Sequence, residues 1–104
     1  MNSIKTGSTF SASLKLLNSK TKQPIIIDDA ISVNAVITNL NNKLISNVDI
    51  QIPDQNAYTG FIILEVNSNE TNNWPIGDAN LNLTFKINDK IIKADSYKFM
   101  IERG

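Results

Sequence analysis

Cysteine and histidine are both absent from this sequence of 104 residues. Without cysteine the chain can form neither a disulfide framework nor a zinc–thiolate site, and thiolate catalysis is excluded. Without histidine it lacks the commonest general base of enzymes and the imidazole ligand of most zinc sites. No spacing of serine and lysine singles out a nucleophile. The sequence therefore predicts a protein that is not an enzyme, with no catalytic residue, no cofactor and no metal ion.

Charge of one sign and long apolar runs are also scarce. Ten basic and ten acidic residues cancel to a net charge of zero. No dense basic stripe is present, which predicts no binding to nucleic acid, because phosphate contacts require clustered lysine or arginine. The longest apolar run, residues 61–64, is far shorter than the ~20 residues that cross a bilayer, and the N-terminus lacks the apolar core of a signal peptide. We therefore expect no membrane segment.

Alternation of apolar and polar residues is the strongest pattern that is present. Phe10, Ala12 and Leu14 occupy every second position, with serine between them. Successive side chains of a β-strand point to opposite faces, so this spacing predicts a strand with one buried and one exposed face. The same period recurs along the chain. The predicted strands are residues 8–17, 25–27, 31–39, 43–52, 60–66, 81–87 and 91–101.

Three positions within this pattern predict finer features. Residues 60–66 are apolar on both faces, which is typical of a central strand. Ser46-Asn47, in the middle of an otherwise alternating segment, indicates a bulge or a break between two short strands. Asn88-Asp89 fits a two-residue hairpin turn.

The C-terminal third contains both the longest irregular stretch and the last strand. Residues 67–73 are polar throughout and predict a loop without regular structure. On the last strand, the period of two predicts Tyr97, Phe99 and Ile101 on the inner face. No window of the sequence has convincing helical periodicity.

These strands predict one all-β domain that spans residues 1–104. Turn signals recur every 8–12 residues, which is typical of a sandwich or a small barrel. Two facing sheets can absorb all of the alternating apolar sets. We therefore expect an immunoglobulin-like antiparallel β-sandwich of about seven strands.

The only tryptophan and the asparagines before it are candidates for contact with a partner or a glycan. These residues are Trp74, Asn69, Asn72 and Asn73. An exposed tryptophan can stack on a sugar or anchor a protein partner, and function concentrates on loops. A structural role explains the same residues, because Trp74 could close the open end of the core and residues 67–73 could be a solvated connection. Both interpretations stay open.

Asp28 and Asp29 are adjacent carboxylates of the kind that ligate calcium at the end of a sandwich. No Asp-x-Asp-x-Asp-Gly pattern accompanies them. A solvated turn that ends the preceding strand is the preferred interpretation.

Strand edges are the other candidate surface. Residues 25–27 and the first part of residues 43–52 carry few of the lysines and prolines that guard exposed edges. We expect these edges either to serve for assembly into a larger object or to be covered by neighbouring loops.

Five short motifs occur in an order that resembles a family of phage proteins. They are TGSTF at residues 6–10, QPI at 23–25, TGF at 59–61, WPIG at 74–77 and IER at 101–103. The sequence is similar to short immunoglobulin-like β-sandwich proteins of tailed bacteriophages and prophages, of the tail, baseplate or head-decoration type. The resemblance implies a structural role for the motif residues and transfers no catalytic or ligand-binding residue.

The resemblance and the lack of a chemical site lead to one expected function and two alternatives. We expect a non-enzymatic virion protein, associated with the tail, baseplate or capsid, that contacts other virion proteins and can also self-associate. It would be located in the virion, or in the cytoplasm of the bacterial host during assembly. The alternatives are a phage-encoded inhibitor or regulator that binds one host protein, and a carbohydrate-binding module.

Overall fold

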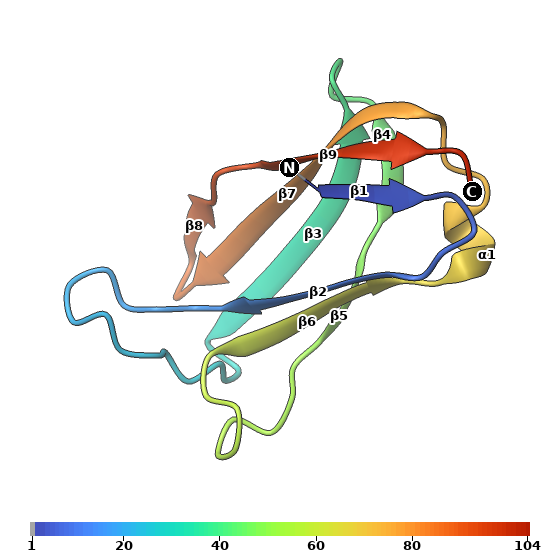
Figure 1. Ribbon diagram of the computed structural model, residues 1–104. Coiled ribbons are helices and arrows are strands. Elements are labelled where there is room, and N and C mark those ends of the chain that lie inside the picture. Colours follow the sequence, from blue (N-terminus) through green and yellow to red (C-terminus); the bar gives the residue numbers. More distant parts are fainter. Residues whose placement is uncertain (1) are drawn as a thin grey trace.

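Residues 2–104, which the computed structural model describes, form nine β-strands and one short helix. The strands make two sheets that pack face to face, so the protein is an all-β sandwich (Figure 1). The larger sheet contains, in spatial order, β1 (Asn2–Lys5), β9 (Tyr97–Glu102), β7 (Gly77–Ile87), β3 (Ile31–Asn39) and β4 (Leu44–Asn47), with β8 (Lys90–Lys93) beside the end of β7. The smaller sheet contains β2 (Phe10–Lys15), β6 (Phe61–Val66) and β5 (Asp49–Gln51).

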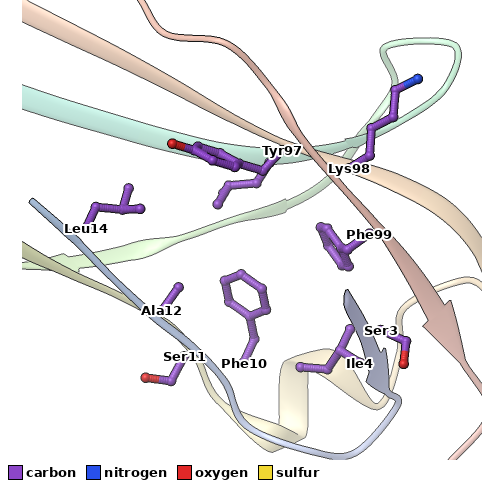
Figure 2. A pocket seen from close by; sticks show the side chains of 10 residues that line it. Ser3, Ile4, Phe10, Ser11, Ala12, Leu14, Tyr97, Lys98 and Phe99 are labelled. Carbon is purple, nitrogen blue, oxygen red and sulfur yellow. The ribbon is translucent and has the colours of Figure 1, made fainter. Parts of the chain in front are cut away.

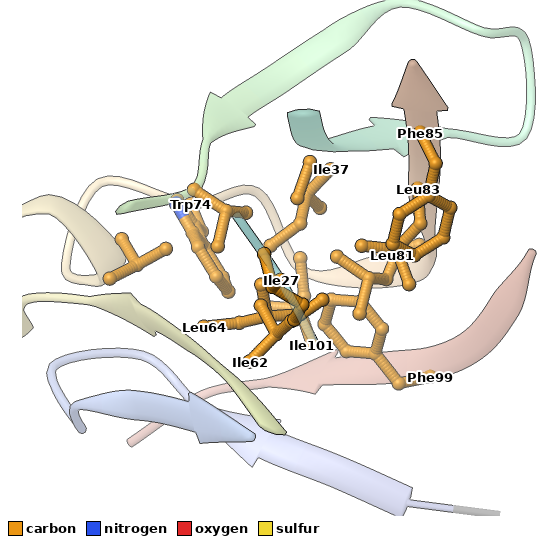
Figure 3. Close-up of a cluster of buried hydrophobic side chains, with 14 residues drawn as sticks. Ile27, Ile37, Ile62, Leu64, Trp74, Leu81, Leu83, Phe85, Phe99 and Ile101 are labelled. Atoms are coloured by element: carbon orange, nitrogen blue, oxygen red, sulfur yellow. The ribbon is translucent and has the colours of Figure 1, made fainter. Parts of the chain in front are cut away.

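The core lies between the two sheets and is built by the predicted alternation. In the β3–β7 pair Ile37 lies opposite Leu81, and both side chains are buried. Ile62 and Leu64 of β6 are completely buried in the same cluster (Figure 3). Apart from Thr38, which is buried, the alternate residues on β3 and β7 are partly or fully exposed, as a period of two requires. The all-β sandwich predicted from the sequence is confirmed.

The central position of β6 is confirmed as well. This strand pairs with β2 on one side and with β5 on the other. Its even-numbered side chains face the core, while Phe61 and Ile63 on the other face are only half-buried. A segment that is apolar on both faces of its strand is therefore found here with a neighbouring strand on each edge.

Residues 25–27 do not form a strand, contrary to the prediction. Pro24 has no backbone N–H to donate, and it makes only an isolated bridge with Leu17. The N–H of Ile27 is bonded at 3.0 Å to Oε1 of Gln55, and the same oxygen accepts from the N–H of Gly60 at 2.8 Å. A side chain thus takes the place of a strand partner, and the segment stays extended without joining a ladder.

Strand β1 was not predicted, because four residues are too few to establish alternation. It pairs with β9 in parallel, with Ile4 opposite Ile101. This parallel pair departs from the wholly antiparallel sandwich that the sequence predicts. The other strand pairs of residues 2–104 are antiparallel.

The other strand boundaries follow the sequence closely. Residues 43–52 divide into β4 and β5, which confirms the break predicted near Ser46-Asn47, and residues 91–101 divide into β8 and β9. The β7–β8 hairpin turns at Asn88-Asp89, with φ of 48° and 68°. Positive φ at both central residues is the signature of a type I′ turn, so the predicted two-residue hairpin is confirmed.

The helix α1 (Ser68–Thr71) occupies the stretch that was predicted to be irregular. Asn67 caps it, and its side-chain oxygen accepts a hydrogen bond from the N–H of Glu70 at 2.9 Å. One turn of helix is too short to produce apolar periodicity, so the residue pattern did not predict it. No helix of the described residues is long and apolar enough to span a membrane.

We predict that Ile62→Ala lowers the free energy of unfolding by about 2–5 kcal/mol, because it leaves a cavity in the middle of the core. Leu44→Ala is the matched control. It removes an aliphatic side chain that is 60% exposed, so we expect a change within about 0.5 kcal/mol. Urea denaturation followed by circular dichroism measures both values, and equal losses for the two variants would contradict the assignment of the core.

Candidate functional site

One long side of the sandwich is closed by the chain itself. The last residue of β4, Asn47, lies opposite Val36 of β3, and the first residue of β5, Asp49, lies opposite Glu65 of β6. Only Val48 separates them. It is buried, and its N–H is bonded to the carbonyl of Ala35 at 3.1 Å. The backbone therefore passes from one sheet directly into the other along this side.

The opposite side is open, and we call it the open side. It is bounded by β1 and β8 at the edge of the larger sheet and by β2 at the edge of the smaller one. The chain crosses between the sheets here only at one end, through the β1–β2 connection at residues 6–9 (Figure 1). The three-stranded sheet does not cover the inner face of the six-stranded sheet completely.

A groove of about 370 Å³ runs between β2 and the β1–β9 pair on this side (Figure 2). Most of the residues that line it are apolar. They are Ser3, Ile4, Phe10, Ser11, Ala12, Leu14, Leu81, Tyr97, Lys98 and Phe99. Protein interiors are filled to high density, so an apolar space between two sheets indicates a surface that lacks its cover.

Two aromatic residues that line the groove, Phe10 and Phe99, pack against the buried ring of Trp74. The ring of Phe10 lies 5.9 Å from that of Trp74 and 5.7 Å from that of Phe99, between centroids. Trp74 and Phe99 are themselves 6.3 Å apart. The tilted arrangements are favourable for aromatic pairs, so the three rings stabilise one another at this end of the groove.

Two side chains of the inner face of the larger sheet are exposed on the open side. Tyr97 lies opposite Leu81 and Ile92 lies opposite Phe85, and directly opposed residues share one face of a sheet. Leu81 and Phe85 are buried, but Tyr97 is 53% exposed and Ile92 is 48% exposed. The register thus supports the predicted inner-face position of Tyr97, although no strand covers it.

Strand β2 supplies an unpaired backbone edge beside the groove. Along a strand the backbone N–H and C=O groups of successive residues point to opposite edges. The N–H of Leu16 is bonded to the carbonyl of Gly60, so the backbone groups of the even-numbered residues point toward β6. The backbone groups of Ser11, Ser13 and Lys15 therefore point away from the sheet. Among residues 2–104, β2 has no strand partner other than β6. The open side combines free hydrogen-bonding groups with apolar surface.

Trp74 does not present its ring to solvent. It is 5% exposed and packs within the core, and its Nε1 has no hydrogen-bond partner. Asn69, Asn72 and Asn73 lie on the surface at and just beyond α1. The structure thus separates the aromatic ring from the asparagine amides, and the four residues do not form one stacking surface. The position of Trp74 corresponds to the structural interpretation of this residue.

The helix α1 is anchored at the end of the sandwich by two side-chain contacts. Oγ1 of Thr71, which is completely buried, donates to the carbonyl of Ser8 at 2.7 Å. Oγ of Ser46 donates to Oε2 of Glu70 at 3.0 Å. These bonds hold α1 against the β1–β2 connection and β4, so the helix covers one end of the core.

Two further candidates from the sequence are the carboxylates Asp28 and Asp29 and the edge of residues 43–52. Oδ1 of Asp28 accepts from the N–H of Ala30 at 2.9 Å, which forms a local turn, and no group of acidic residues within the described part of the chain is arranged to hold a metal ion. Strand β4, which contains the first part of residues 43–52, lies at the edge of the larger sheet, and its Leu44 side chain is exposed. The edge of β2 was not predicted, because sequence periodicity shows which face of a strand is buried and not which edge is free.

Comparison with known proteins adds no relative to this description: no family model matches the chain, and no match is found among curated proteins.

We predict that the fluorescence of Trp74, the only tryptophan, is blue-shifted in the folded protein and little affected by iodide. Its buried ring is shielded from a charged quencher, whereas urea-unfolded protein should show red-shifted and fully quenchable emission. Addition of bacterial surface glycans should leave the spectrum unchanged. Saturable quenching by a glycan would instead indicate that Trp74 contacts sugar.

Proposed function

We propose that this chain is a non-enzymatic component of a phage particle, associated with the tail, baseplate or capsid, which acts by protein–protein contact through its open side. The observation that carries the proposal is the combination there of an apolar groove with an unpaired strand edge. Exposed apolar surface beside free backbone groups is the chemistry that binds protein strands by β-augmentation. Short motifs resembling those of phage structural proteins supply the expected setting, which is the virion or the bacterial cytoplasm during assembly.

The order of the strands supports the immunoglobulin-like part of this proposal. In the immunoglobulin sandwich the first, second, fifth and fourth strands form one sheet, and the third, sixth and seventh form the other. Here the smaller sheet runs β2-β6-β5 and the larger sheet contains β3-β7-β9. If β1 is taken as the first strand, and β4 and β8 as inserted ones, the orders of these strands correspond. The first strand differs in its place: β1 pairs with β9 in the larger sheet, so β2 has no neighbour on the side where the first strand of the immunoglobulin sandwich lies.

The same surface would also serve an inhibitor of a host protein, so the experiment must separate these two functions. Mass spectrometry of purified particles from the bacterium that carries this sequence should detect the chain at constant stoichiometry to the major structural proteins. Its recovery in host lysate, bound in equal amount to one bacterial protein and absent from particles, would instead support the inhibitor.

We predict that Tyr97→Ser reduces incorporation into particles by about tenfold, since it removes an exposed aromatic anchor from the mouth of the groove. Tyr58→Ser is the matched control, because Tyr58 is 57% exposed on the loop between β5 and β6, away from the groove. Incorporation is measured by complementing a deletion with each variant. Equal effects of the two substitutions would argue against the open side as the contact surface.

A further inference from the structure

We propose that the first partner of the open side is a second copy of this chain, joined through antiparallel pairing of the two β2 strands about a two-fold axis at Ser13. The inference rests on the proposed function and names the partner of the same surface. It would extend the smaller sheet into one continuous sheet across two molecules. Symmetric pairing of identical surfaces is the commonest mode of assembly for soluble proteins.

Among the free edges on the open side, β2 is the least protected. Strand β8 begins and ends with a lysine, at Lys90 and Lys93, and all four of its residues are exposed. Strand β1 has four residues and ends at Lys5. Strand β2 has six residues, and its exposed side chains are Ser11, Ser13 and Lys15. Edge strands are normally guarded by lysine, proline or a bulge, and β2 carries one lysine at its end.

One register uses the free backbone groups of β2 fully and keeps like charges apart. The free groups belong to odd-numbered residues, so odd-numbered residues must lie opposite odd-numbered residues. An axis at Ala12 or Leu14 would leave Lys15 or Ser11 opposite a residue outside β2. An axis at Lys15 would place two ammonium groups directly opposite each other, which is destabilising. An axis at Ser11 would run the strand into Gly7, whose φ of 83° is not extended. The axis at Ser13 uses the free N–H and C=O groups of all three residues.

The outer face of the extended sheet then gains a charge partner. Glu65 and Asp49 lie directly opposite each other, and the neighbour of Glu65 on the other side is Ser11. The register of the smaller sheet thus places two carboxylates together with no cation beside them, while Lys15 lies over the ring of Phe61 at the far end, 5.2 Å from its centroid. In the pairing centred on Ser13, Lys15 of the second copy faces Ser11.

Lys15 of the second copy therefore lies two strand spacings from Glu65, roughly 10 Å between backbones. An extended lysine and a glutamate bridge this gap across the short side chain of Ser11. On the inner face the same register sets Ala12 against Leu14 and Phe10 against Leu16. The mouths of two grooves meet, and Tyr97 of each copy loses its exposure to water.

A single cysteine at the proposed axis tests the pairing, because the natural chain has none. Directly opposed residues of a hydrogen-bonded antiparallel pair lie about 5.5 Å apart at Cα, within the span of a disulfide. We expect S13C to form a covalent dimer on mild oxidation of the folded protein. S11C alone and K15C alone should not, since in this register each residue is about 14 Å from its own copy. An equimolar mixture of S11C and K15C should form the mixed dimer.

Charge exchange at exposed positions tests the same register without oxidation. Sedimentation should show a concentration-dependent dimer of the natural protein. K15E should raise its dissociation constant by about tenfold, because the new carboxylate approaches Glu65 and Asp49. The double variant K15E/E65K should restore most of the affinity. Ser13→Pro should abolish the dimer while the circular dichroism of the monomer is kept, because proline is tolerated on a strand edge whose N–H is unused.

The outcomes separate this inference from the function on which it rests. Cross-linking of S13C together with the mixed S11C and K15C pair supports the register. A strictly monomeric protein, or equal cross-linking of S11C alone and S13C, overturns self-pairing. If such a monomer is still found in particles, the proposed function stands and the partner of β2 is another virion protein. A dimer that is absent from particles leaves the self-pairing supported and overturns the virion role.

Discussion

The packing of β6 against the β3–β7 pair holds the two sheets together, and the unequal widths of these sheets determine the rest of the surface. Ile62 and Leu64 meet Ile37 and Leu81 in the part of the sandwich where both layers are present. A sheet of three strands cannot cover a sheet of six. Side chains at the uncovered margin, such as Tyr97, keep the inward direction that the pleat imposes but have no layer to pack against. The groove is therefore a direct result of the core that stabilises the fold.

The two long sides of the sandwich differ in whether the gap between the sheets is closed. On one side the backbone itself changes sheets at Val48, which leaves no gap between the layers. On the other side the strands end at β1, β8 and β2, and the connection at residues 6–9 closes only one end. Apolar side chains are costly to leave in water, and free backbone groups can pair with a further strand, so this asymmetry favours the open side as the contact surface that we propose. A binding role that needs no catalytic group is consistent with this arrangement.

For several residues of the site, the sequence showed which face of the strand the side chain is on but not whether that face is covered. The period of two placed Phe10, Ala12 and Leu14 together on one face of β2. It also placed Tyr97 and Phe99 together on one face of β9, and the register agrees with both assignments. It could not distinguish Phe99, which is buried beside Trp74, from Tyr97, which is half in water, because coverage depends on a strand from the other sheet. Likewise the asparagines near residue 70 were recognised as a surface stretch, but the single turn of helix that anchors them through Thr71 is too short to have a period.

The sequence by itself determined most of the strands and the side chains that form the core, because period-two burial and turn chemistry are local properties of the chain. The alternation along β3, β6 and β7 and the left-handed residues Asn88 and Asp89 are examples of such local information. Only the tertiary structure decided which strands became edges, that Trp74 turned inward, and that β2 was left with one neighbour. Those outcomes depend on contacts between residues far apart in the chain, and no short segment contains the information about what will lie beside it.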